Sequence, residues 1–260
     1  MPAISIAVQR SGAQAAAQPA DLAAVGKTKL PILAWANGAC ANEGDAFAKF
    51  LTEIAGHGYL VMAIGPIVGP KPPATGPAPR PDMNAPPKTT SSQLIDAINW
   101  AVAENARSDS RYKGRLDVKK IAVMGMSCGG LQAIEASADP RVTTTGVWNS
   151  GVLGTGTGGL PGANVTKASL KALHGPAIYV SGDASDIAFA NANDDFARID
   201  HIPVFWRGCR RVAELAAERP QGRSGDVRRS GLPPLRATGL ACRAQGPEIG
   251  ARGGLSLARR

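Results

Sequence analysis

The sequence predicts an α/β protein whose mostly parallel sheet is flanked by helices on both faces. Short, continuous apolar runs recur along the chain, which is typical of strands buried on both faces. Segments with helical periodicity separate most of these runs, as crossovers between parallel strands require. At 260 residues the chain is long enough to bury such a sheet in one sizeable domain.

Apolar runs and turn signals place the individual elements. Strands are expected at 30–38, 59–65, 118–125, 142–151, 175–182 and 202–206. Helices are expected at 43–58, 92–107, 128–138 and 187–199. Between 66 and 89 nine prolines and no periodicity indicate a long surface loop.

Composition divides the chain into three segments. Residues 1–28 are Ala-rich and weakly patterned, so a loose segment is expected, and 29–206 form the α/β domain. The net charge is +9, but 207–260 hold twelve arginines against four acidic residues, so the domain itself is near neutral. This tail has no aromatic residue and is expected to be disordered or the product of a frame shift. No nucleic-acid partner is expected, since the tail lacks aromatic side chains that stack on bases.

Several classes of protein receive no support from the sequence. Without an apolar run of 18 residues, no membrane span is expected. Gln9 and Arg10 interrupt any apolar core near the N-terminus, so no signal peptide is predicted and the compartment stays open. The four cysteines form no C-x-x-C or Cys/His cluster, so neither a metal nor a cofactor is expected. Cys40 and Cys128 are expected in neighbouring loops, either as a disulfide or as two buried thiols.

The stretch "IAVMGMSCGG" (121–130) predicts a nucleophilic serine. It reads as strand, G-x-S-x-G and helix in that order, a context in which Ser127 sits on a tight turn above the sheet. The turn requires small residues on both sides, and the following helix dipole favours negative charge there. The backbone N–H of Cys128 is the first candidate donor to an oxyanion.

Two further loops supply candidates for the same site. The stretch "WANGAC" (35–40) ends the first strong strand and offers Ala39, then Cys40, as the second oxyanion donor. After the strand at 175–182, Asp183 or Asp186 could orient a histidine. Asp194 and Asp195 lie further along and are expected to be charges on a helix surface.

A serine turn followed by an acid in this strand order resembles the α/β-hydrolase superfamily, and within it the dienelactone hydrolase/cutinase-like esterases. The resemblance covers about 30–206 and rests on "LPILAWANG", "LDVKKIAVMGMSCGG" and "IYVSGDASDIAF". It implies an α/β-hydrolase fold, incomplete at its C-terminal part, and a serine hydrolase that cleaves a small-molecule carboxylic ester through an acyl-enzyme. It selects Asp186 over Asp183 as the acid. It also implies a substrate-binding wall at Trp148, for which core packing is the alternative.

The chain departs from this family at the base, which is a histidine after the last strand. No histidine follows "IPVFW" (202–206), and His57, His174 and His201 all precede strands. These three are therefore expected at the opposite end of the sheet, about 15 Å from Ser127 at roughly 3.3 Å per strand residue. We expect little or no esterase activity, and a non-catalytic ligand-binding protein of the same fold is the alternative.

Overall fold

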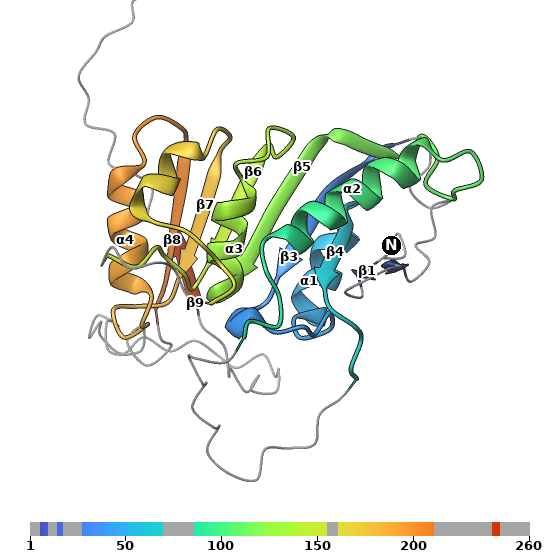
Figure 1. The fold of residues 1–260 in the computed structure, drawn as a ribbon. Coiled ribbons are helices and arrows are strands. Elements are labelled where there is room, and N and C mark those ends of the chain that lie inside the picture. The colour runs from blue at the N-terminus through green and yellow to red at the C-terminus, as the bar shows by residue number, and fades with distance from the viewer. Residues whose placement is uncertain are drawn as a thin grey trace, which may run out of the picture.

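The structure, a computed structural model, describes residues 28–69, 86–154 and 161–208, and the backbone alone of 6–9, 15–17, 209–210 and 241–244. Six parallel strands run in the order β4-β3-β5-β6-β7-β8 (Figure 1). They are β3 (Leu30–Ala36), β4 (Leu60–Ile64), β5 (Leu116–Met126), β6 (Thr144–Trp148), β7 (Ala177–Ser181) and β8 (Val204–Arg210). The predicted α/β fold with a parallel sheet is therefore confirmed.

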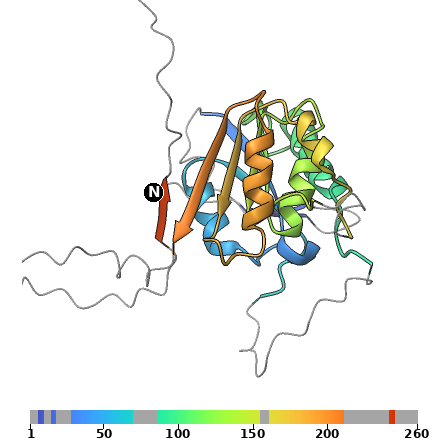
Figure 2. The same ribbon diagram turned by 90° about the vertical axis from the view of Figure 1, so that its left-hand side faces the viewer.

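Four α-helices cover the two faces of this sheet. They are α1 (Ala48–Gly56), α2 (Ser92–Ala106), α3 (Cys128–Ala136) and α4 (Phe189–Arg198). Helices α2, α3 and α4 pack on one face and α1 on the other, as the edge-on view shows (Figure 2). Within the described part of the chain, every helix is too short or too polar to cross a membrane.

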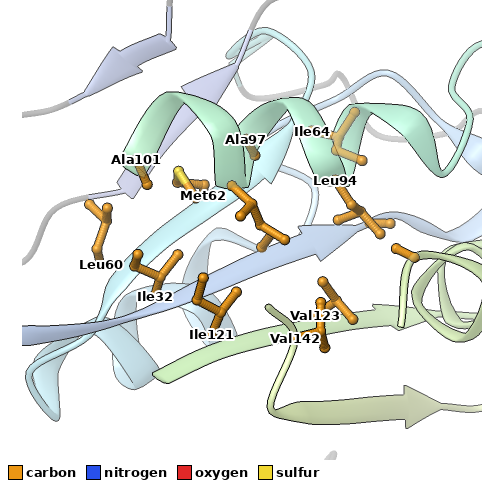
Figure 3. Packing of buried hydrophobic residues seen from close by; sticks show 14 of the residues in the cluster. Ile32, Leu60, Met62, Ile64, Leu94, Ala97, Ala101, Ile121, Val123 and Val142 are labelled. Atoms are coloured by element: carbon orange, nitrogen blue, oxygen red, sulfur yellow. The ribbon is translucent and has the colours of Figure 1, made fainter. Parts of the chain in front are cut away.

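The core forms because alternate residues of each strand face opposite layers. On one face, Ile32 of β3 and Met62 of β4 pack under α2, which presents Leu94, Ala97 and Ala101 at helical spacing (Figure 3). The neighbouring strand residues Leu33, Trp35, Val61 and Ala63 pack against α1 on the other face. Continuous apolar runs are thus required in these strands, and this explains why their positions could be predicted.

Both edges of the sheet differ from the prediction. Strand β1 (Ile6–Gln9) pairs in parallel with β4 and antiparallel with β2 (Ala15–Ala17), so 1–28 is not loose throughout. At the other edge β8 continues to Arg210 and pairs antiparallel with β9 (Ala241–Ala244), so the last strand ends later than the expected bounds of 202–206. Strand β2 is three alanines and β9 reads ACRA, compositions that give no strand signal, whereas Ile6 and Val8 of β1 alternate as in a strand. The expected disorder or frame shift of the tail concerns mostly 211–240 and 245–260, outside the described residues.

The direction in which successive strands are added to the sheet reverses at one point, between β3 and β5. From β3 the chain moves to β4 on one side, then crosses to β5 on the other side of β3 and continues outward to β8. The loops that follow β3 and β5 therefore leave the sheet in opposite directions. In open parallel sheets ligands bind at this point, beyond the carboxyl ends of the strands.

Candidate active site

Ser127 follows β5 at this switch point and has a strained backbone conformation. It joins β5 to α3 with φ 53° and ψ −120°, a region that residues other than glycine rarely adopt. Its N–H donates to the Trp148 carbonyl at 2.9 Å, and its carbonyl accepts from Ser150 Oγ at 2.7 Å. Such strain persists only where the surroundings hold it, and it is concentrated at functional sites.

The glycines on either side of Ser127 let three backbone segments meet. A Cβ at Gly125 would overlap the backbone of Gly129, and a Cβ at Gly129 would overlap the carbonyl of Ala36 at the end of β3. The requirement for small residues around the serine, predicted from the motif, is therefore confirmed. The same packing presses the loop after β3 against the turn that carries Ser127.

Helix α3 begins at Cys128, directly after the serine. The first N–H groups of a helix have no partner within it, so the N–H of Cys128 points out of the helix end. The helix dipole adds positive potential there. This end of α3 therefore suits a negative charge that develops beside Ser127.

The loop after β3 makes a tight turn beside the one that carries Ser127. Residues Gly38–Cys40 make one 3₁₀ turn, in which Ala39 and Cys40 have φ 52° and 47°. The buried side chain of Asn37 fixes this turn, because its Nδ2 donates to the carbonyls of Ala41, Glu43 and Ile64 at 2.8–3.2 Å. Sequence reasoning did not single out Asn37, although an Asn-Gly pair after a strand is a recognised turn signal.

A disulfide between Cys40 and Cys128 joins the two candidate donor loops. Of the two alternatives that the sequence left open, the disulfide is therefore the one observed. The two Cα atoms lie 5.3 Å apart, and both residues are buried. Ala39 and Cys128, the two predicted oxyanion donors, are thus brought to adjacent positions.

Of the two candidate acids, Asp186 is the one that is hydrogen-bonded to the segment after the neighbouring strand β6. Its Oδ2 accepts from the N–H of Gly182 at 3.2 Å and from Asn149 Nδ2, and its Oδ1 accepts from the N–H of Ala188 at 2.9 Å. Asn149 follows β6 with φ 43°, so it ties the ends of β6 and β7 together. Asp183 instead accepts from Ser185 within its own turn. Its predicted alternative role as a turn residue matches this arrangement.

Asp195 corrects the expectation of a surface charge. The residue is fully buried, on the same helical stripe as Ala192 and Ile199. Its carboxylate accepts from Lys167 Nζ at 2.6 Å and from the N–H of Val152 at 2.7 Å. Burial raises the pKa of the Asp195 carboxyl, and the hydrogen bond from Lys167 opposes that rise. The network holds the segment after β6 against α4.

Trp148 ends β6 on the face of the sheet that α1 covers. Its ring packs edge-on against Trp35 and Phe50, with centroids 5.6 and 5.7 Å away. The side chain is only partly buried. Core packing, the alternative reading, is therefore observed, and a contact with substrate stays a prediction.

The three histidines of the chain lie at the amino ends of strands, as predicted. His57 precedes β4, His174 precedes β7 and His201 precedes β8, whereas Ser127 follows the carboxyl end of β5. His201 is occupied locally, with Nε2 2.9 Å from the Leu173 carbonyl. No histidine of this chain can accept the Ser127 proton in this arrangement.

Exposed apolar side chains follow several strands at the carboxyl end of the sheet, the end at which Ser127 lies. They are Ile67 and Val68 after β4, Leu153 after β6 and Ile187 after β7. The Asp45 carboxylate accepts from the N–H groups of Val68 and Gly69, which fixes one of these segments. The carboxyl end of the sheet therefore exposes apolar surface that a bound molecule could contact.

Comparison with known proteins adds no family assignment, since no family model and no curated protein matches the chain. Within the described residues, no group of three or more His, Cys, Asp or Glu side chains is placed to hold a metal ion.

Proposed function

We propose that this chain is a serine hydrolase of the α/β-hydrolase fold whose site acts on carboxylic esters, in the manner of the dienelactone hydrolase/cutinase-like esterases. The observation that carries the proposal is the left-handed backbone of Ser127 between a strand and a helix, packed through Gly125 and Gly129 against the end of β3. A simple glycine-rich turn needs no such strain at a serine. The position of Ser127 at the point where the strand order reverses supports the same function.

Each candidate residue then has one role. Ser127 Oγ attacks the ester carbonyl, and the N–H groups of Ala39 and Cys128 receive the resulting oxyanion. The alcohol leaves, and water cleaves the acyl-serine. Asp186 would orient an imidazolium through the acceptor capacity that its Oδ1 retains. The exposed apolar residues at the carboxyl end of the sheet favour an uncharged, apolar ester.

The missing element is the base. Without a nearby histidine the Ser127 hydroxyl is a weak nucleophile, so the chain by itself should turn over esters slowly or not at all. This absence favours one alternative, a ligand-binding protein of the same fold that performs no chemistry. A defined ligand bound beside Trp148 without turnover would support that alternative.

Hydrolysis of p-nitrophenyl acetate and butyrate tests the proposal, with Ser127→Ala as the negative variant and the exposed Ser108→Ala as its matched control. In plain buffer all three proteins should be equally slow. Added imidazole can replace the missing base, and subtracting the Ser127→Ala rate removes the hydrolysis that imidazole causes by itself. The parent and Ser108→Ala should then exceed Ser127→Ala. Equal rates at every imidazole concentration would refute ester hydrolysis at Ser127.

A further inference from the structure

Gln132 occupies the point where three loops of the candidate site meet. It is fully buried and lies one helical turn after Cys128 on α3. Its Nε2 lies 3.2 Å from Cys40 Sγ, 3.0 Å from the Thr89 carbonyl oxygen and 3.1 Å from the Gly162 carbonyl oxygen. One side chain thus joins the loop after β3, the segment before α2 and the segment after β6.

The orientation of the Gln132 amide follows from its partners. The carbonyls of Thr89 and Gly162 can only accept, so the NH₂ group must face them. The other end, Oε1, is buried and has no hydrogen-bond partner within the described part of the chain. An unpaired buried carbonyl costs stability. An apolar side chain of similar size would avoid this cost, so packing alone does not explain a glutamine here.

The contacts of Gln132 converge on Cys40 from several sides. Thr89 Oγ1 donates to the Cys40 carbonyl at 2.9 Å, while the Thr89 carbonyl accepts from Gln132. Gly162, with φ +99°, covers the disulfide so closely that a Cβ there would lie 2.6 Å from Cys40 Sγ. Cys40 is therefore held at its carbonyl, at its sulfur and by the bond to Cys128.

This hold is needed because Ala39 and Cys40 both have left-handed backbones, which relax unless the surroundings hold them. We propose that Gln132 is a positioning residue: through Cys40 and Thr89 it holds the backbone N–H groups of Ala39 and Cys128 where an oxyanion develops. That these N–H groups serve an oxyanion rests on the proposed ester hydrolysis. The hold itself is a property of the loop and can be measured without any catalysis.

Amide hydrogen exchange tests the hold. Gln132→Met keeps the size of the side chain and removes both donors, and Thr89→Val removes the hydroxyl that binds Cys40. The matched control is Ser137→Ala, which removes a buried hydroxyl from the far end of α3. With the disulfide intact, Gln132→Met should speed exchange in 38–41 by roughly tenfold or more, Thr89→Val by less, and Ser137→Ala not at all. Unchanged exchange in 38–41, or equal acceleration across the whole domain, overturns the proposal.

A kinetic measurement tests whether Gln132 positions the oxyanion donors for ester hydrolysis. The imidazole-dependent, Ser127-dependent rate should fall in Gln132→Met by about tenfold or more in kcat with little change in KM, since a misplaced oxyanion donor acts on the transition state. An unchanged kcat overturns the inference. If the parent shows no Ser127-dependent turnover, the proposed function fails, and the exchange of 38–41 alone decides whether Gln132 positions the loop.

Discussion

Cys40 and Cys128 form a disulfide, with Cα atoms 5.3 Å apart and a sequence separation of 88. The bond joins the turn after β3 to the residue that follows Ser127. The loops that leave β3 and β5 in opposite directions are thereby connected beyond the carboxyl ends of these two strands. Preorganised donors need a rigid frame, and this bond supplies one at the two loops concerned.

Removing the disulfide should destabilise the domain strongly. Closing a loop of this length in the unfolded chain is worth about 4–5 kcal/mol in the chain-entropy description. The free energy of unfolding of Cys40→Ala/Cys128→Ala, measured in urea, should fall by about that amount, and dithiothreitol should have the same effect on the parent. Dithiothreitol added to the double variant serves as the control. Equal urea midpoints for oxidised and reduced parent would contradict a structural role of the bond.

Gly129→Ala should prevent the close contact between α3 and the end of β3. The added Cβ would overlap the Ala36 carbonyl, and neither backbone can move without breaking the sheet or the turn. We expect a loss of about 3 kcal/mol or more in the free energy of unfolding. Gly154→Ala is the matched control, since a Cβ there meets no atom within 4 Å. A Gly129→Ala protein as stable as Gly154→Ala would show that the segments are not in contact.

Lys167→Met should leave the buried Asp195 carboxylate without its cation. Breaking a buried ion pair typically costs about 3 kcal/mol or more. Lys171→Met, which changes an exposed lysine of the same 3₁₀ helix, should cost far less. Thermal unfolding of the two variants compares them directly, and equal losses would contradict the buried pair.

The effect of Lys167→Met should depend on pH. Burial holds the folded-state pKa of the Asp195 carboxyl above its unfolded value, and loss of Lys167 raises that pKa further. Such a group stabilises the fold below its unfolded pKa, and this contribution disappears as pH rises through the folded pKa. The cost of the substitution should therefore be small at about pH 4 and complete at about pH 7. A loss of unfolding free energy on Lys167→Met that is larger at about pH 4 than at about pH 7 would contradict this expectation.

The sequence predicted the central sheet well because its strands must be apolar on both faces. It did not reveal β1, β2 or β9. Strand β2 is three alanines and β9 reads ACRA, so neither carries such a pattern, whereas Ile6 and Val8 of β1 do alternate as in a strand. These strands lie at or near the sheet edges, where partners in space rather than composition determine pairing. The edge strands are thus the part of this fold that only the structure revealed.

The candidate site was predictable where motif and strand order agree, as at Ser127 and the loop that holds Ala39. The buried Asp195 was missed although its spacing from Ala192 and Ile199 follows the helical period, which Asp194 does not. Gln132 was missed because its partners come from segments far away in the sequence. The signal that could have drawn attention to it was its position on α3, one turn after Cys128 and next to the apolar Leu131.

The most direct test of the central claim is mass spectrometry of the peptide that contains Ser127 after incubation with p-nitrophenyl acetate. If Ser127 is the nucleophile and only its base is missing, as proposed, an acetyl group should form on Ser127 when imidazole is present and little or none should form without it. Ser127→Ala should remain unmodified on this peptide in both conditions. Absence of the acetyl group with imidazole would contradict the nucleophile, and rapid acetylation and turnover in plain buffer would contradict the missing base and direct attention back to His201.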